Sequence, residues 1–128
     1  LGSVGEIAVF AYLVSGVDLT KLTTVGGATG NAQNPSLAIS SIVDLSIMLA
    51  VCSTEANITG VGADQTILGP LTDQFFENAA ASSKIPKTPL GSDTSQFLTG
   101  SGQSYALSGI FLAPYSPEVR GHLLQMFQ

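Results

Sequence analysis

The clearest pattern of apolar positions along the chain runs from residue 35 to residue 55. A stripe at helical spacing is formed by Ala38, Ile42, Leu45, Leu49 and Cys52. Asn34 followed by Pro35 is typical of a helix start, with Asn as the cap and proline at the first helical position. The other faces of this segment are also mostly apolar. The pattern therefore predicts a helix over about 35–55 that lies at the centre of a bundle or in an interface.

Shorter apolar segments predict further helices. A capping-box spacing between Ser3 and Glu6 precedes an apolar run and predicts a helix over roughly 4–15, although the Val, Phe and Tyr residues of this run also favour strands. Cap residues and apolar spacing predict four more helices. One begins near 64 or 69 and contains Leu71, Phe75 and Phe76, and a short one begins near 92 and contains Phe97 and Leu98. The third runs from 103 to 113, and the last begins at 116 and contains Val119 and Leu123.

The connections between these elements are marked by glycine and proline. Glycines and asparagines between residues 23 and 34 predict a flexible loop, and two prolines between 84 and 91 predict an extended linker. Together the elements predict an all-α bundle of five or six helices with glycine-rich loops, in a single domain over residues 1–128. The many Thr, Ser, Val and Gly residues leave an all-β or mixed sandwich open as the alternative.

Low charge is the most informative feature of the composition. Only 10% of the 128 residues are Asp, Glu, Lys or Arg, whereas soluble domains carry roughly 25%. Like molecules then repel one another weakly, so self-association costs little. The four basic residues are scattered and outnumbered by nine acids, which excludes a nucleic-acid surface. The longest strongly apolar run, 42–52, contains Asp44 and is too short to span a bilayer, so no membrane span is expected.

No set of residues in the sequence predicts catalysis, a cofactor or a metal. His122 is the only histidine and no Gly-x-Ser-x-Gly motif accompanies it. Asp73 and Glu77 are the only acids spaced to share a helix face, and such a pair without further ligands favours a solvated surface. The glycine-rich stretch 26–30 lacks the Lys and Ser or Thr of a phosphate loop. We therefore expect a protein that is not an enzyme.

Cys52 is the only cysteine, so no internal disulfide or cysteine zinc site can form. Its apolar neighbours favour a buried side chain that behaves as a small hydrophobe. The alternative is an intermolecular disulfide that links two copies of the chain.

The C-terminal residues 118–128, with Glu118-Val119-Arg120 and a Met-Phe end, resemble the last helix of the N-terminal domains of spider silk proteins. Residues 35–78 resemble the third and fourth helices of that family through Glu55, a glycine-rich turn and the segment 71–76. The chain departs from the family in having no tryptophan, in its longer 23–34 loop and in residues 84–116. The resemblance implies acid-triggered dimerisation, for which Glu55 and Glu118 would be the pH-sensitive interface residues.

These observations lead to a functional hypothesis with two alternatives. The low charge, the acidic balance and the Ser/Thr/Gly-rich surface favour a secreted, extracellular structural subunit that assembles with copies of itself into a fibre, filament or shell. A small helical carrier of a hydrophobic ligand is the first alternative. A fragment or subunit of a larger complex is the second.

Overall fold

The computed structural model describes residues 11, 13–21, 24–41, 43–74, 77–86 and 89–115. These residues form eight strands and no helix. The strands are β1 (Val25–Ala32), β2 (Ser36–Ser40), β3 (Ile47–Thr54), β4 (Ile58–Val61), β5 (Gln65–Gln74), β6 (Glu77–Lys84), β7 (Ser92–Thr99) and β8 (Gln103–Leu112).

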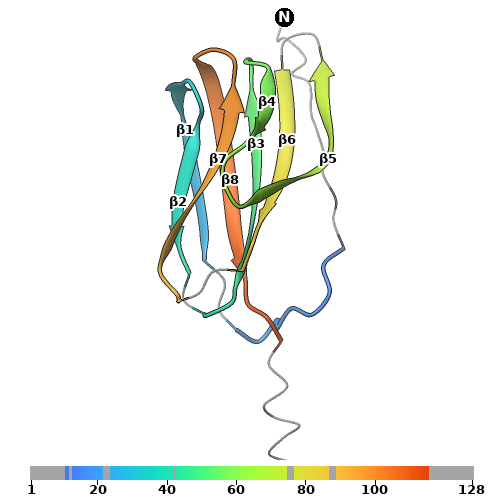
Figure 1. The fold of residues 1–128 in the computed structure, drawn as a ribbon, viewed down its shortest axis with the longest axis vertical. Coiled ribbons are helices and arrows are strands. Elements are labelled where there is room, and N and C mark those ends of the chain that lie inside the picture. The colour runs from blue at the N-terminus through green and yellow to red at the C-terminus, as the bar shows by residue number, and fades with distance from the viewer. Residues whose placement is uncertain are drawn as a thin grey trace, which may run out of the picture.

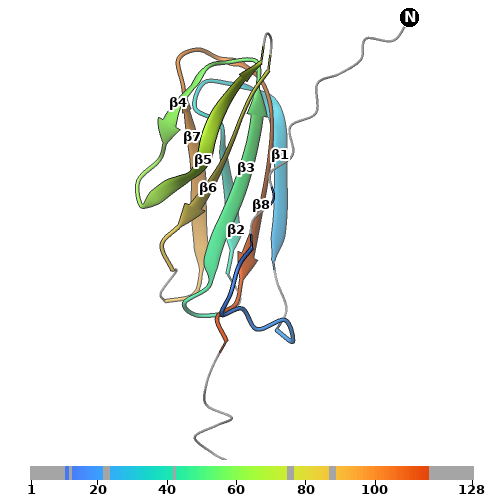
Figure 2. The same cartoon turned by 90° about the vertical axis from the view of Figure 1, so that its right-hand side faces the viewer.

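The strands build two antiparallel sheets that pack face to face. The order is β1-β8-β3-β6-β5 in the five-stranded sheet and β2-β7-β4 in the three-stranded sheet. The pairings β1 with β8, β2 with β7 and β3 with β6 are nested along the chain, as in an eight-stranded jelly roll. Figure 1 shows the strands running along the long axis, and Figure 2 shows the two layers from the side, with β4 and β7 on one side and β1 and β8 on the other.

The core lies between the two sheets and is built by strand alternation. Every second residue of a strand points to the same face of its sheet. The buried cluster accordingly takes alternate residues from both layers: Leu37, Ile39, Met48, Ala50, Cys52, Ile58, Ala80, Phe97, Leu107 and Phe111. Phe97 of β7 and Cys52 of β3 are 0% exposed, so both sheets contribute to the centre of the core.

The predicted all-α helical bundle is wrong, and the alternative, an all-β sandwich, is the observed fold. The predicted helix over 35–55 is replaced by β2, a turn and β3. Asn34, predicted as a helix cap, adopts a φ of 55° in a turn, and its Oδ1 accepts a hydrogen bond of 2.8 Å from the backbone N–H of Thr99. The local Asn-Pro signal is therefore satisfied by a distant strand rather than by a following helical turn.

The other predicted helices are corrected in the same way. The segment after residue 64 forms the hairpin of β5 and β6, and the segment from 92 forms β7. The segment 103–113 forms β8, which ends at Leu112, one residue before Ala113. Of the predicted helix over 4–15, only residues 11 and 13–15 are described, and they are not helical. The predicted helix from 116 onward lies outside the described residues. Residues 35–78, which resemble two helices of spider silk domains, lie in β2 to β6 and their connections.

The glycine-rich stretch predicted as a loop forms β1, at the edge of the five-stranded sheet. One of its glycines, Gly26, makes room for the opposite sheet. A Cβ atom on Gly26 would lie only 3.0 Å from Cγ1 of Ile39 in β2. The position paired with Gly26 in β8 is Gly109, where a Cβ atom would lie 3.1 Å from Cδ1 of the same isoleucine. Close approach of the sheets, rather than a loop, explains these glycines.

Within the described part of the chain, no helix is long and apolar enough to cross a membrane.

Candidate interaction surface

β3 has apolar side chains on both of its faces. Met48, Ala50 and Cys52 point into the core, where each is at most 2% exposed. The alternate residues Ile47 and Val51 point to the other side of the sheet and are each 37% exposed. An antiparallel sheet that faces water on one side normally carries polar residues there. The exposed apolar residues of β3 therefore indicate a candidate interaction surface on this side of the sheet.

Neighbouring strands extend this apolar surface. We call it the outer apolar face, and it comprises Val25 of β1, Ile47, Leu49 and Val51 of β3, Leu68 of β5 and Ile110 of β8. Val25 is 69% exposed. A hollow of about 370 Å³ lies in the face between β1, β8 and β3, and none of its lining residues is charged. Contiguous exposed apolar patches on soluble proteins commonly mark interaction sites.

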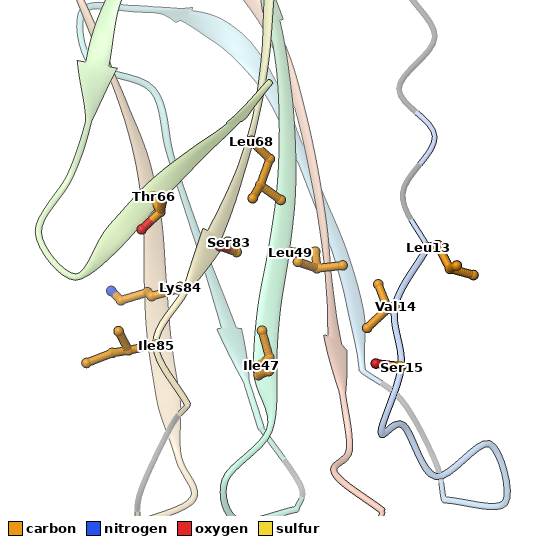
Figure 3. A pocket seen from close by; sticks show the side chains of 10 residues that line it. All are labelled: Leu13, Val14, Ser15, Ile47, Leu49, Thr66, Leu68, Ser83, Lys84 and Ile85. Atoms are coloured by element: carbon orange, nitrogen blue, oxygen red, sulfur yellow. The ribbon is translucent and has the colours of Figure 1, made fainter. Parts of the chain in front are cut away.

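A second hollow of about 390 Å³ lies over the half of the face nearer β5. Residues 13–15 form one wall of this hollow and strands β3, β5 and β6 form its floor. Figure 3 shows the side chains of Val14 and Leu49 pointing toward one another across it, while Leu13 points away from the sheet and is 102% exposed. Residues 13–15 therefore lie over only part of the outer apolar face.

The charge nearest this hollow is engaged on the other side of the sheet. Nζ of Lys84 lies 2.8 Å from Oδ1 of Asp93 and donates a hydrogen bond of 2.7 Å to the backbone oxygen of Thr94. Figure 3 shows the ammonium end of Lys84 directed away from the hollow. This ion pair joins β6 to β7 and so links the two sheets. Because of this ion pair, the charged group of Lys84 does not point into the hollow.

A buried polar network also links the sheets beneath the face. Nε2 of Gln65 in β5 donates 2.9 Å hydrogen bonds to the hydroxyls of Ser82 in β6 and Ser95 in β7. Its Oε1 accepts a 2.7 Å hydrogen bond from the backbone N–H of Gln96. A fully satisfied network of this kind holds a single arrangement of the two layers. The network therefore fixes the position of the sheet that carries the outer apolar face relative to the smaller sheet.

The structure places the lone cysteine in the core. Cys52 is 0% exposed, and burial raises the pKa of its thiol to about 12. Since the thiolate is the nucleophile in disulfide formation, both facts oppose the intermolecular disulfide that its isolation in the sequence allowed. The interpretation that its apolar neighbours favour, a buried cysteine acting as a small hydrophobe, fits the structure.

Of the two residues predicted to form a pH-sensitive interface, only Glu55 lies in the described part of the chain. Glu55 is exposed between β3 and β4, beside a shallow hollow of about 180 Å³ formed with Ser104 and Tyr105. Glu118 lies outside the described residues, as does His122. Asp73 and Glu77 belong to the two strands of the β5–β6 hairpin rather than to one helix face.

An exposed acid outside the outer apolar face has a shifted pKa. The hydroxyl of Thr20 donates a 2.6 Å hydrogen bond to Oδ1 of Asp18, and the backbone N–H of Thr20 donates another of 3.0 Å. These two bonds, the side-chain bond first, lower the pKa of Asp18 below its usual value. This arrangement stabilises a turn and does not form part of a site.

Across the described ranges, no group of three or more His, Cys, Asp or Glu side chains is placed to hold a metal ion. The fold and the surface define the class of the protein as an antiparallel β-sandwich with an apolar outer face on its larger sheet. Comparison with protein-family models, with curated proteins and with solved structures finds no match to this chain.

Sequence reasoning identified none of the residues of the outer apolar face as a site. The signal was nevertheless present, because the segment around residues 47–52 is apolar on every side, and the helix prediction already placed such a segment in a core or an interface. Read at a period of two, the same residues divide into a core set and an exposed set. Val25 and Ile110 carry no such signal, because their position beside β3 depends on long-range pairing.

Proposed function

We propose that this chain is a non-catalytic, secreted structural subunit that associates with copies of itself through the outer apolar face. The observation that carries the proposal is the exposure of Ile47 and Val51 at the centre of the larger sheet, with Val25 on the strand at its edge. Burial of apolar area provides the main driving force for association. The low charge of the chain limits the repulsion that such a contact would have to overcome.

A second copy suits this face because it supplies the same chemistry. A two-fold interface brings one patch against itself, so the patch must be free of charges that would repel their own copies. The hollow between β1, β8 and β3 meets this condition, since its lining consists of aliphatic residues, glycine and serine. Face-to-face packing of two sheets is also the contact that the sandwich itself uses.

The test is the molecular mass of Val51→Lys measured by sedimentation equilibrium over a range of concentrations. Val51 is partly exposed at the centre of the face, so the folded chain accepts a lysine there. A pair of lysines in a dry, two-fold contact should lower the association constant by about tenfold or more, a difference of roughly 1.4 kcal/mol. Leu90→Lys is the matched control, since Leu90 is 55% exposed in the connection between β6 and β7, away from the face.

We expect Leu90→Lys to associate as the unchanged chain does. If Val51→Lys did so as well, the outer apolar face would not be the interface. If the unchanged chain stayed monomeric at every concentration, self-association itself would be refuted.

Association should also strengthen as the pH falls from 7 toward the sequence pI of 4.4. The net charge of −5 decreases over this range because carboxylates take up protons, so repulsion between copies decreases. Glu55→Gln tests the residue that the resemblance to spider silk domains implies as a pH sensor, and Asp44→Gln is its control as another exposed acid. A pH dependence unaltered by Glu55→Gln would assign the effect to net charge rather than to Glu55.

A hydrophobic-ligand carrier is the second candidate, and the hollow beneath residues 13–15 is the observation that favours it. Its volume of about 390 Å³ falls within the range of small-molecule sites. Mass spectrometry of organic extracts from the purified protein tests this function. A monomer that yields a stoichiometric apolar compound would support the carrier in place of the structural subunit.

A further inference from the structure

Among the described strands, the edge of β1 that lies away from β8 is a second candidate surface. β1 pairs with β8 on one side and with no other described strand. The N–H of Phe111 donates a 2.9 Å hydrogen bond to the carbonyl of Thr24, immediately before β1. Because backbone groups alternate along a strand, residues 26, 28 and 30 also bond to β8. The N–H and C=O groups of Val25, Gly27, Thr29 and Asn31 therefore point away from the sheet.

β1 lacks the features that normally protect a sheet edge. Such features include prolines, charged side chains, bulges and short strands. β1 has eight residues, Val25–Ala32, with neither charge nor proline, and an uninterrupted register against β8. A strand of this kind is a template for pairing with another chain.

The other edges of the sandwich are protected. β5, at the opposite edge of the same sheet, contains Pro70 and a register shift between Leu68 and Thr72. In the smaller sheet, β2 has five residues, and β4 has four residues with an irregular register against β7. β1 is thus the only long and regular edge that the described strands offer.

The geometry points to antiparallel pairing of β1 with β1 of a second copy, which joins two five-stranded sheets into one. A two-fold axis at Ala28 places Val25 opposite Asn31 and Gly27 opposite Thr29. Each outward-pointing residue then meets another outward-pointing residue, which gives about eight hydrogen bonds, two for each bonded pair. No like charges meet along the strand, because it has none. This match of β1 with itself is the reason for assigning the edge to a second copy.

Edge pairing deepens the proposed function, on which it rests for the identity of the partner. Opposite residues of an antiparallel pair lie on the same side of the sheet. The outer apolar faces of the two copies therefore become continuous across the shared edge. Face contacts and edge contacts together let the chain grow beyond a dimer, whereas either contact alone closes at two copies.

The test uses Thr29→Pro, with Thr29→Ala as the matched control. Thr29 is exposed, and its N–H faces the open edge, so proline removes a donor to the second copy without removing a bond to β8. Alanine removes the same side chain but keeps the N–H. In a Val51→Lys background, where only the edge can pair, we expect dimers that Thr29→Pro weakens by about tenfold or more relative to Thr29→Ala.

A second variant tests edge pairing without proline, in case proline disturbs folding of the chain. Thr29→Lys keeps the donor and places two lysines diagonally across the paired strands, so dimerisation should weaken and recover as salt is added. Amide hydrogen exchange gives a direct readout. The amides of Gly27 and Thr29 should exchange slowly in the dimer and rapidly in the monomer, while that of Ala28 is protected in both.

The outcomes separate the edge from the face. If Val51→Lys forms no dimer, or if its dimer leaves Gly27 and Thr29 in fast exchange, edge pairing is overturned. If Thr29→Pro associates to the same size and strength as the unchanged chain does while Val51→Lys stays monomeric, edge pairing is likewise overturned and the face interface stands. If Val51→Lys forms dimers as strongly as the unchanged chain does and Thr29→Pro stays monomeric, the face interface fails and edge pairing stands.

Discussion

Gly109→Ala tests how closely the two sheets approach one another. The added methyl carbon would lie 3.1 Å from Cδ1 of Ile39, 3.2 Å from the carbonyl oxygen of Leu49 and 3.3 Å from Cδ2 of Leu37. The isoleucine and the leucine of β2 can shift by small changes of rotamer. The carbonyl oxygen belongs to the backbone of β3, which is held by its pairing with β8. The strain therefore cannot be relieved by side chains alone.

The expected loss of stability follows from two opposing effects. Overpacking of this kind costs about 1–3 kcal/mol. Replacing glycine also reduces the conformational freedom of the unfolded chain, which contributes about 0.4–1 kcal/mol in favour of the folded state. The net prediction is a decrease of about 1–2 kcal/mol in the free energy of unfolding, or on the order of 3–8 °C in Tm.

Urea denaturation at low protein concentration, which limits any self-association, measures this change. Gly100→Ala is the control, because no atom lies within 4 Å of its added carbon and its φ is not positive. It retains the effect on the unfolded chain and should be neutral or slightly stabilising. Ile39→Val removes the atom nearest to the new methyl carbon, so it should cost about 1 kcal/mol less in the Gly109→Ala background than in the unchanged chain.

Equal stabilities of Gly109→Ala and Gly100→Ala would refute the reasoning. They would mean that the sheets are far enough apart for a methyl group at position 109. Gly26 and Gly109 would then need another explanation.

Three further predictions concern the core and the surface. The Cys52 thiol should react with an aromatic disulfide reagent only after denaturation. Because the pKa of this thiol is raised from 9.0 to about 12, the free energy of unfolding should decrease above pH 9 by on the order of 1 kcal/mol per pH unit. Gln65→Leu should lower the free energy of unfolding by about 3 kcal/mol in urea titrations, since two buried serine hydroxyls and the N–H of Gln96 lose their partner. Thr20→Ala should raise the pKa of Asp18 in an NMR titration, and the stability from this hydrogen bond should be present above the ordinary carboxyl pKa and lost as the pH falls through the lowered one.

The prediction of helices failed where apolar residues have roles on both faces of a strand. In β3, the polar and apolar alternation that identifies a half-buried strand is absent because Ile47, Leu49 and Val51 form the outer apolar face. A continuous apolar run does not distinguish a helix from a strand by periodicity alone. The exposed residues that make the candidate surface therefore also concealed the secondary structure.

Local signals were ambiguous for a second reason, which is that their partners are distant in sequence. Asn34 and Pro35 would suit a helix start, but the hydrogen bonds of Asn34 with Thr99 place them in a turn between strands. The glycines between 26 and 30 are typical of a loop, and only the packing of β2 against β1 shows why a strand needs Gly26. The contact of Asn34 with Thr99 and the packing of β2 against β1 cannot be inferred from the residues next to them in the sequence.

The sequence by itself determined the low charge, the acidic balance and the punctuation of the chain by glycine and proline, because these are properties of residue types and not of their arrangement. The proline-rich stretch 84–91, for example, falls at the end of β6 and in the connection to β7. Only the tertiary structure decided that the elements are strands, that Cys52 is buried, and that Val25, Val51 and Ile110 share one face. The physical reason is that a strand acquires its hydrogen bonds and its two environments from neighbours far along the chain.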